Sequence, residues 1–142
     1  DISPAQAMLL LEIGDGDIEP RDLIERRHYL ASTATYNIRK LVEAGATIQA
    51  TDPQAIDNAR QALSDLPDDA IEYNTSNYAV CEGADALFLF TEWEQFRHPD
   101  FEHLRQLLNS PTVFDGRNIY SPDRLADLGF DYVAVGRPKV TN

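Results

Sequence analysis

Helix-type and strand-type patterns alternate along this sequence, and no other feature restricts its fold as strongly. From Ala34 onward, a segment with apolar residues at helical spacing is followed by a short apolar run four times. The clearest run, Ala86–Phe90, is continuous and apolar, which is typical of a strand covered on both faces. Because parallel strands are joined by helical crossovers, this alternation predicts a parallel sheet with helices on both faces.

The boundaries of these elements follow from apolar runs, capping residues and glycines. Strands are predicted at Ala7–Ile13, Thr47–Ala50, Ala86–Phe90, Thr112–Phe114 and Tyr132–Val135, with a weaker one at Ile71–Tyr73. Helices are predicted at Arg21–Leu30, Gln54–Leu66, Tyr78–Glu82, Phe101–Leu108 and Ser121–Leu128. Another helix is predicted to run to about Ala44, with Ser32, Thr33 or Thr35 as its cap. The 142 residues, 43% of them hydrophobic, suit one domain with a real core. We therefore predict an α/β fold. It is a three-layer, Rossmann-like domain over residues 1–142, with a mostly parallel five- or six-stranded sheet and helices on both faces.

The strongest candidate for a binding site follows the strand at Thr112–Phe114. The chain continues there as Asp115-Gly116-Arg117-Asn118, a polar turn at the carboxyl end of a predicted parallel strand, where ligands collect in open α/β sheets. Gly116 lets backbone approach a ligand closely, and Arg117 offers a rigid fork of donors that suits a phosphate. The alternative is a surface turn in which Arg117 pairs with Asp115 or with a neighbouring carboxylate.

Two further strand ends carry polar or aromatic residues. Thr91, Glu92 and Trp93 follow the strand at Ala86–Phe90, so that Thr91 and Trp93 could wall a ligand site, the alternative being that Trp93 packs on the next helix. Asp52 follows the strand at Thr47–Ala50. We expect it to cap the next helix rather than to hold a ribose hydroxyl, because no complete glycine fingerprint G-x-G-x-x-G occurs in the sequence. A phosphate-binding role for Gly14–Gly16 stays open.

The net charge and the cysteine content limit the binding partners and the cellular compartment that the sequence suggests. The net charge of −12 repels polyanions, so no nucleic-acid partner is expected, and no apolar run reaches the roughly 18 residues that cross a membrane. Cys81 is the single cysteine and lies inside a predicted helix beside Glu82, so we expect it to pack rather than react, in a reducing, cytoplasmic compartment. His98 and His103 have no third ligand in view, so no metal site is predicted.

Four sequence motifs together carry a family resemblance. They are E-A-G-A-T-I-Q-A-T-D-P at Glu43–Pro53, E-G-A-D-A-L-F-L-F-T-E-W at Glu82–Trp93, F-D-G-R-N-I-Y at Phe114–Tyr120 and L-G-F-D-Y-V-A-V-G-R at Leu128–Arg137. In this order and spacing they resemble the C-terminal, UDP-binding domain of the UDP-glucose/GDP-mannose dehydrogenase family, most closely its UDP-glucose 6-dehydrogenase branch. The resemblance covers about three quarters of the chain, from about Ile38 to Pro138.

The resemblance implies a function for the complete enzyme and a limited role for this chain. Family members use NAD to oxidise the C6 alcohol of a nucleotide sugar, such as UDP-glucose to UDP-glucuronate in polysaccharide biosynthesis, through a thioester on a catalytic Cys. That Cys lies in a G-F-G-G-S-C-F-type motif, which this sequence lacks along with the NAD fingerprint, so the chain alone is expected to be inactive and not to bind NAD. By resemblance Arg117 contacts the nucleotide sugar, and Thr91, Glu92 and Trp93 line the cleft toward a missing NAD-binding domain. Whether the chain forms a homo-oligomer stays open.

Residues 1–36 depart from the family pattern. After the first strand the family has G-L-A-F-K-P, whose Phe-Lys pair reaches the substrate. The motif T-D-D-I-R-E follows, and its Arg reaches the cofactor. Here the region reads L-L-L-E-I-G-D-G-D-I-E-P-R-D, without a Phe-Lys pair, and Arg21 is the shifted counterpart of the cofactor-contacting Arg.

Two interpretations follow for the chain as a whole. In the first it is the nucleotide-sugar-binding domain of a UDP-glucose 6-dehydrogenase, which the intact Asp115–Asn118 turn favours. In the second it is a stand-alone, non-catalytic binding or assembly module that kept the fold, which the missing Phe-Lys pair favours.

Overall fold

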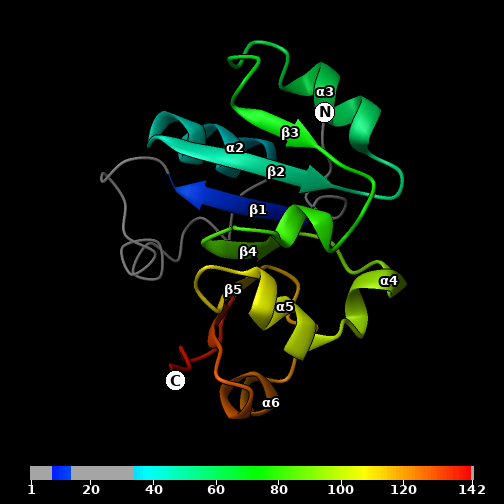
Figure 1. The fold of residues 1–142 in the computed structure, drawn as a ribbon. Coiled ribbons are helices and arrows are strands. Elements are labelled where there is room, and N and C mark those ends of the chain that lie inside the picture. Colours follow the sequence, from blue (N-terminus) through cyan, green and yellow to red (C-terminus); the bar gives the residue numbers. More distant parts are fainter. Residues whose placement is uncertain (1–7, 14–33, 142) are drawn as a thin grey trace.

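The described part of the chain comprises residues 8–13 and 34–141 of a computed structural model (Figure 1). The predicted helix at Arg21–Leu30, the candidate cofactor residue Arg21 and the glycines Gly14 and Gly16 lie outside these residues. The strands are β1 (Met8–Ile13), β2 (Ala46–Thr51), β3 (Ile71–Tyr73), β4 (Ala86–Leu89), β5 (Thr112–Asp115) and β6 (Asp131–Ala134). The helices are α2 (Ala34–Glu43), α3 (Ile56–Ala62), the 3-10 turn η2 (Ala79–Cys81), α4 (Glu94–Arg97), α5 (Phe101–Leu107) and α6 (Pro122–Asp127).

The six strands form one sheet in the order β3-β2-β1-β4-β5-β6. Strand β2 runs parallel to β3, and β4, β5 and β6 run parallel to one another. Strand β1 lies between β2 and β4 and is antiparallel to both, so β2 and β4 point the same way. The mostly parallel, six-stranded α/β sheet is therefore as predicted. Five strands share one direction, and their carboxyl ends meet at one edge.

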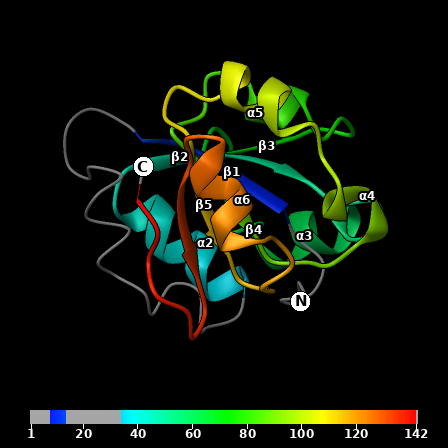
Figure 2. The ribbon, with the colours of Figure 1, turned by 90° about the horizontal axis from the view of Figure 1, so that it is seen from below.

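Helices cover both faces of the sheet, which gives the predicted three layers (Figure 2). On one face, Ile38 and Leu41 of α2 and Ala59 of α3 pack with the side chains of Phe88 and Phe114. A second cluster on the other face joins η2, α4, α5 and α6 to the sheet; its members include Cys81, Phe96, Leu104, Leu125, Leu87, Val113 and Tyr132. Alternate residues of β4 thus enter opposite clusters. This explains why its sequence is continuously apolar.

Local sequence sets where several helices begin and end. The side chain of Ser121 accepts a hydrogen bond from the Arg124 N–H at 3.4 Å, and Pro122 occupies the first turn of α6. Asp100 caps α5 in the same way through the His103 N–H, at 3.0 Å. Helix α2 ends before Gly45, whose φ of +94° suits a residue without a Cβ.

Two element predictions need correction. Helix α3 is shorter than the predicted Gln54–Leu66, because residues 53–55 form a turn on the side chain of Asp52 and the helix ends at Ala62. Helix α4 was not predicted; it is a single turn, too short for helical periodicity to reveal. No helix in residues 34–141 combines the length and the apolar character needed to span a bilayer.

Candidate functional site

The candidate residues lie at the edge where the five parallel strands end. We call it the carboxyl edge and define it by residues 52–55, 91–93, 115–120 and 135–137, which follow or close β2, β4, β5 and β6. Strands β4 and β5 are neighbours, so the fold brings Thr91, Glu92 and Trp93 to the same edge as the Asp115–Asn118 turn. The turn also joins β4 directly, since the Gly116 N–H donates to the Leu89 carbonyl at 2.8 Å.

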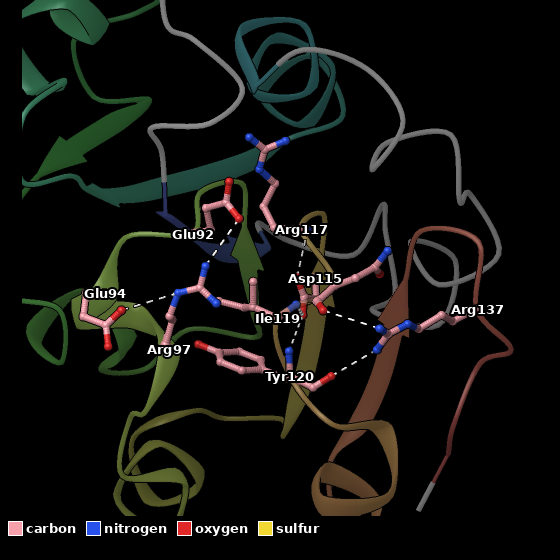
Figure 3. Close-up of polar contacts among 9 residues, drawn as sticks. Glu92, Glu94, Arg97, Asp115, Arg117, Ile119, Tyr120 and Arg137 are labelled. Carbon is pink, nitrogen blue, oxygen red and sulfur yellow. Dashed lines mark hydrogen bonds and ion pairs between the residues drawn. The ribbon is translucent and has the colours of Figure 1, made fainter.

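Asp115 organises the turn from within. Its side chain is fully buried, and its Oδ1 accepts from the Arg117 N–H at 2.9 Å. Its Oδ2 accepts from the Ile119 N–H at 2.9 Å and the Tyr120 N–H at 3.0 Å (Figure 3), and from the Tyr132 hydroxyl at 2.7 Å. Four donors thus converge on one carboxylate. This satisfies the backbone of a turn that would otherwise leave N–H groups unpaired.

A second set of contacts holds the turn from the side of β6. Asn118 adopts a positive φ of 58°, a conformation that Asn tolerates better than most residues, and its Nδ2 donates to the Val135 carbonyl at 3.0 Å. The Arg137 guanidinium donates to the carbonyls of Tyr120 at 3.2 Å and Asn118 at 3.5 Å. Arg137 was not among the predicted site residues. Its signals in the sequence are its place after the last strand and at the end of the Leu128–Arg137 motif.

Arg117 points away from this network. Figure 3 shows its side chain directed away from Asp115, Tyr120 and Arg137, although its backbone N–H is bound to Asp115. Within residues 34–141, its guanidinium forms no ion pair, and its Nε is buried without a hydrogen-bond partner. The alternative in which the Arg117 guanidinium pairs with Asp115 or with a neighbouring carboxylate is therefore wrong for the described residues, since Asp115 is bound by the Arg117 backbone N–H and not by its guanidinium.

The Thr91–Trp93 segment presents three different environments. Thr91 is buried, and its hydroxyl has no hydrogen-bond partner in the described part of the chain. Glu92 is exposed and pairs with Arg97 at 3.4 Å, while the same guanidinium also reaches Glu94 at 3.6 Å. Trp93 is half-buried and packs against the cluster that contains Phe96 of α4.

Asp52 connects the ends of β2 and β4. Its Oδ1 accepts from the N–H groups of Gln54 at 2.8 Å and Ala55 at 2.7 Å, and so holds the turn that leads into α3. The prediction that Asp52 caps the helix itself is wrong, because the N-cap of α3 is Ala55, without a side-chain hydrogen bond. Its Oδ2 accepts from the Trp93 indole N–H at 3.1 Å. Burial raises the pKa of Asp52 above its usual value, against the opposing effect of these three hydrogen bonds. A hollow of about 350 Å³ adjoins the contact, lined by Asp52, Gln54, Asp57 and Thr75 among others.

Cys81 packs in the core, as predicted. It is buried in the cluster below η2, its thiol donates to the Asn77 carbonyl at 3.2 Å, and burial raises its pKa to about 12. A thiol with so high a pKa is a poor nucleophile near neutral pH. In residues 34–141, no group of three or more His, Cys, Asp or Glu side chains is arranged to hold a metal ion.

Comparison with known proteins identifies the family. The model of the UDP-glucose/GDP-mannose dehydrogenase family, UDP binding domain, matches residues 28–122. This chain belongs to that family. It is 47% identical over 96 residues to the UDP-glucose 6-dehydrogenase of Pseudomonas aeruginosa, covering 68% of this chain and 19% of that protein. It is 36% identical over 107 residues to the UDP-glucose 6-dehydrogenase of Rhizobium meliloti, covering 75% and 23%. It is 34% identical over 103 residues to UDP-glucose 6-dehydrogenase TuaD of Bacillus subtilis, covering 72% and 22%.

Most of the candidate site residues lie within the part of the chain that matches the family. The chain spans about a fifth of the length of the relatives it matches. The UDP-binding-domain model includes α2 through β5, and with them Asp52, the Thr91–Trp93 segment and the Asp115–Asn118 turn. Strands β1 and β6, and Arg137 beyond β6, lie outside residues 28–122.

Proposed function

We propose that this chain binds the nucleotide sugar of a UDP-glucose 6-dehydrogenase, which in its complete form oxidises UDP-glucose to UDP-glucuronate. Family membership supports a UDP-binding role, and the matched relatives are UDP-glucose 6-dehydrogenases. The observation that carries the proposal is Arg117, a cation without an ion pair among the described residues, on a turn that Asp115 holds rigid. A phosphate-bearing ligand is the natural partner for such a guanidinium.

The candidate residues divide into contacts and supports. In our proposal the Arg117 guanidinium binds phosphate oxygens, Gly116 admits the ligand close to the backbone, and Asn118 completes the rim of the turn. Thr91, Glu92 and Trp93 line the neighbouring part of the same edge. The buried carboxylate of Asp115 is turned inward to four donors, so its part is to hold the turn in shape.

NAD is assigned to another part of the complete enzyme. The sequence has no G-x-G-x-x-G fingerprint. Asp52, the acidic residue placed where a ribose hydroxyl would be held, already accepts three hydrogen bonds. The described residues therefore do not fit NAD. We assign no catalytic residue to this chain, and we expect it to be inactive without an NAD-binding domain.

Domain extent and compartment complete the proposal. We treat residues 1–142 as one domain, which is supported by a single sheet that draws strands from Met8 to Ala134. The NAD-binding domain of the complete enzyme is the expected partner. A lone buried Cys81 is consistent with a reducing, cytoplasmic compartment.

The proposal is tested by calorimetric titration of the 142-residue chain with UDP and UDP-glucose. A partial site should bind weakly, with a dissociation constant near millimolar, or about −4 kcal/mol. In Arg117→Ala, loss of a charge-assisted contact should cost about 1.5–3 kcal/mol and remove the signal. Arg97→Ala is the matched control. It removes an arginine on α4, outside the carboxyl edge, whose guanidinium is already paired with Glu92 and Glu94, so binding should persist. Equal binding by the wild type and Arg117→Ala would contradict the assignment.

A second candidate function is a non-catalytic binding or assembly module that kept the fold. It is favoured by β1, which lies outside the family match and runs antiparallel within an otherwise parallel sheet. Absence of any UDP or UDP-glucose binding by the wild-type chain would favour this candidate over the first.

A further inference from the structure

One hydrogen bond at the carboxyl edge joins strand ends that are not neighbours in the sheet. Asp52 follows β2 and Trp93 follows β4, and β1 lies between these strands, with Met8 opposite both Thr51 and Leu89. The Trp93 indole N–H reaches across to the Asp52 Oδ2 at 3.1 Å. The contact connects residues 41 positions apart, so it is a tertiary feature of the edge and not a local turn.

The two oxygens of Asp52 serve separate purposes. Oδ1 accepts the two backbone N–H groups of the turn before α3, and Oδ2 accepts only the indole N–H. The turn alone needs one side-chain oxygen, which Ser or Asn supplies as well. Asp52 is only 8% exposed, so keeping a carboxylate here carries a desolvation cost that the turn does not require. The second oxygen therefore has a function beyond the turn.

The indole is well suited to be fixed by that oxygen. An indole has a single donor, so a hydrogen bond from that N–H restricts how the ring of Trp93 can rotate. Trp93 is half-buried, with one side packed on the cluster that contains Phe96. Packing and the Asp52 bond together leave the ring one orientation at the edge.

We propose that Asp52 is a positioning residue whose Oδ2 orients the Trp93 indole and thereby sets the affinity of the carboxyl edge for the nucleotide sugar. This inference rests on the proposed function, in which Trp93 lines the site. It assigns to Asp52 a role in ligand binding that the capping prediction did not include.

The substitution Asp52→Asn separates holding the turn from positioning the indole. The amide keeps an oxygen for the Gln54 and Ala55 N–H groups, but its NH2 then faces the indole N–H, so two donors meet and the bond is lost. Asp57→Asn is the matched control, since Asp57 is an exposed carboxylate that lines the same hollow. Urea unfolding of each variant establishes that it folds.

Trp93 supplies its own readout, because it is the only tryptophan in the chain. In Asp52→Asn we expect stronger quenching of its fluorescence by acrylamide and lower anisotropy, because the ring is less restrained. We also expect UDP-glucose affinity to fall by about threefold to tenfold, the equivalent of one hydrogen bond. Asp57→Asn should change neither quantity.

Trp93→Phe tests the same bond from the other partner. It keeps an aromatic ring and removes the donor without touching the turn, so it stays informative if Asp52→Asn does not fold. Its affinity should fall by a similar factor, and the double variant should lose no more than either single variant, because both remove one interaction.

The outcomes separate this inference from the proposed function. If wild type binds UDP-glucose, Arg117→Ala does not, and Asp52→Asn matches wild type in both quenching and affinity, the proposed function stands and the inference is overturned. Fully additive losses in the double variant would also overturn it. If wild type does not bind at all, the proposed function fails and the link to affinity falls with it. The quenching comparison then still decides whether Asp52 orients Trp93.

Discussion

The buried carboxylate of Asp115 gives the sharpest test of how the turn is held. Asp115→Asn keeps the shape of the side chain, while one oxygen becomes an NH2 group. Since Oδ2 accepts three donors and Oδ1 accepts one, the amide oxygen should occupy the Oδ2 position. The NH2 group then faces the Arg117 N–H, and that hydrogen bond is lost.

The cost of Asp115→Asn can be worked from these four contacts. The three bonds that remain change from charge-assisted to neutral, which weakens each by about 1 kcal/mol, and the lost bond adds about 1.5–3 kcal/mol. Removing a buried charge relieves desolvation and offsets part of this sum. We therefore expect a net loss of about 2–4 kcal/mol in the free energy of unfolding. That is well below the total expected for a domain of this size, so the variant should still fold.

The assay is urea unfolding followed by circular dichroism, with the free energy obtained by linear extrapolation. Asp127→Asn, an exposed carboxylate on α6, is the control and should lie within about 0.5 kcal/mol of wild type. A change below about 0.5 kcal/mol in Asp115→Asn would refute the argument. It would mean that the desolvation energy recovered by removing the buried charge equals the energy lost from the four hydrogen bonds, so that the turn does not depend on the carboxylate.

Two further predictions concern neighbours of Asp115. Asn118→Ala loses the hydrogen bond to the Val135 carbonyl and places Ala at a φ of 58°, so it should destabilise the chain by about 1–2 kcal/mol in the same urea assay. Asn118→Gly should destabilise it by less, because Gly adopts this φ without strain. Equal losses in the two variants would contradict the role of the backbone conformation. Burial and the Asp115 carboxylate raise the pKa of Tyr132 above its usual value of about 10. As pH rises, the Tyr132 hydroxyl therefore loses its proton in the unfolded chain before it does so in the folded chain. Its contribution to the free energy of unfolding is complete below about pH 10 and is lost as pH rises through the folded-state pKa. The urea midpoint between pH 8 and 11 should decline less steeply in Tyr132→Phe than in wild type, and identical slopes would contradict this.

Much of the fold was predictable because it rests on local patterns. The four clear strands after Ala34 appear as apolar runs, and Gly45 and Ser121 mark helix ends through their own conformational and capping preferences. The direction of β1 was not predictable in the same way. An apolar run indicates a strand covered on both faces but carries no information about which way the strand points.

The position of the candidate site in the fold was predictable from the sequence, but the hydrogen bonds that hold it together were not. Because ligands gather at the carboxyl ends of parallel strands, the sequence alone predicts that the Asp115–Asn118 turn and the Thr91–Trp93 segment lie at one edge. The inward orientation of Asp115, the clamp from Arg137 and the bond between Asp52 and Trp93 all depend on contacts between segments far apart in the chain. Residue spacing encodes none of them, because each is decided by the order of the strands in the sheet.

The hydrogen bonds and ion pairs at the carboxyl edge explain how a chain with a net charge of −12 could bind an anion at the proposed site. At the carboxyl edge the acidic groups are already engaged: Asp115 by four donors, Asp52 by three, and Glu92 by Arg97. Charges elsewhere on the surface act through solvent and are largely screened beyond about 8 Å at physiological salt. A small phosphate-bearing ligand bound at Arg117, as we propose, would therefore experience the local guanidinium and the backbone of the turn more than the total charge. A long polyanion would contact the acidic surface over its whole length. This is why the composition argues against nucleic acid without arguing against a nucleotide sugar.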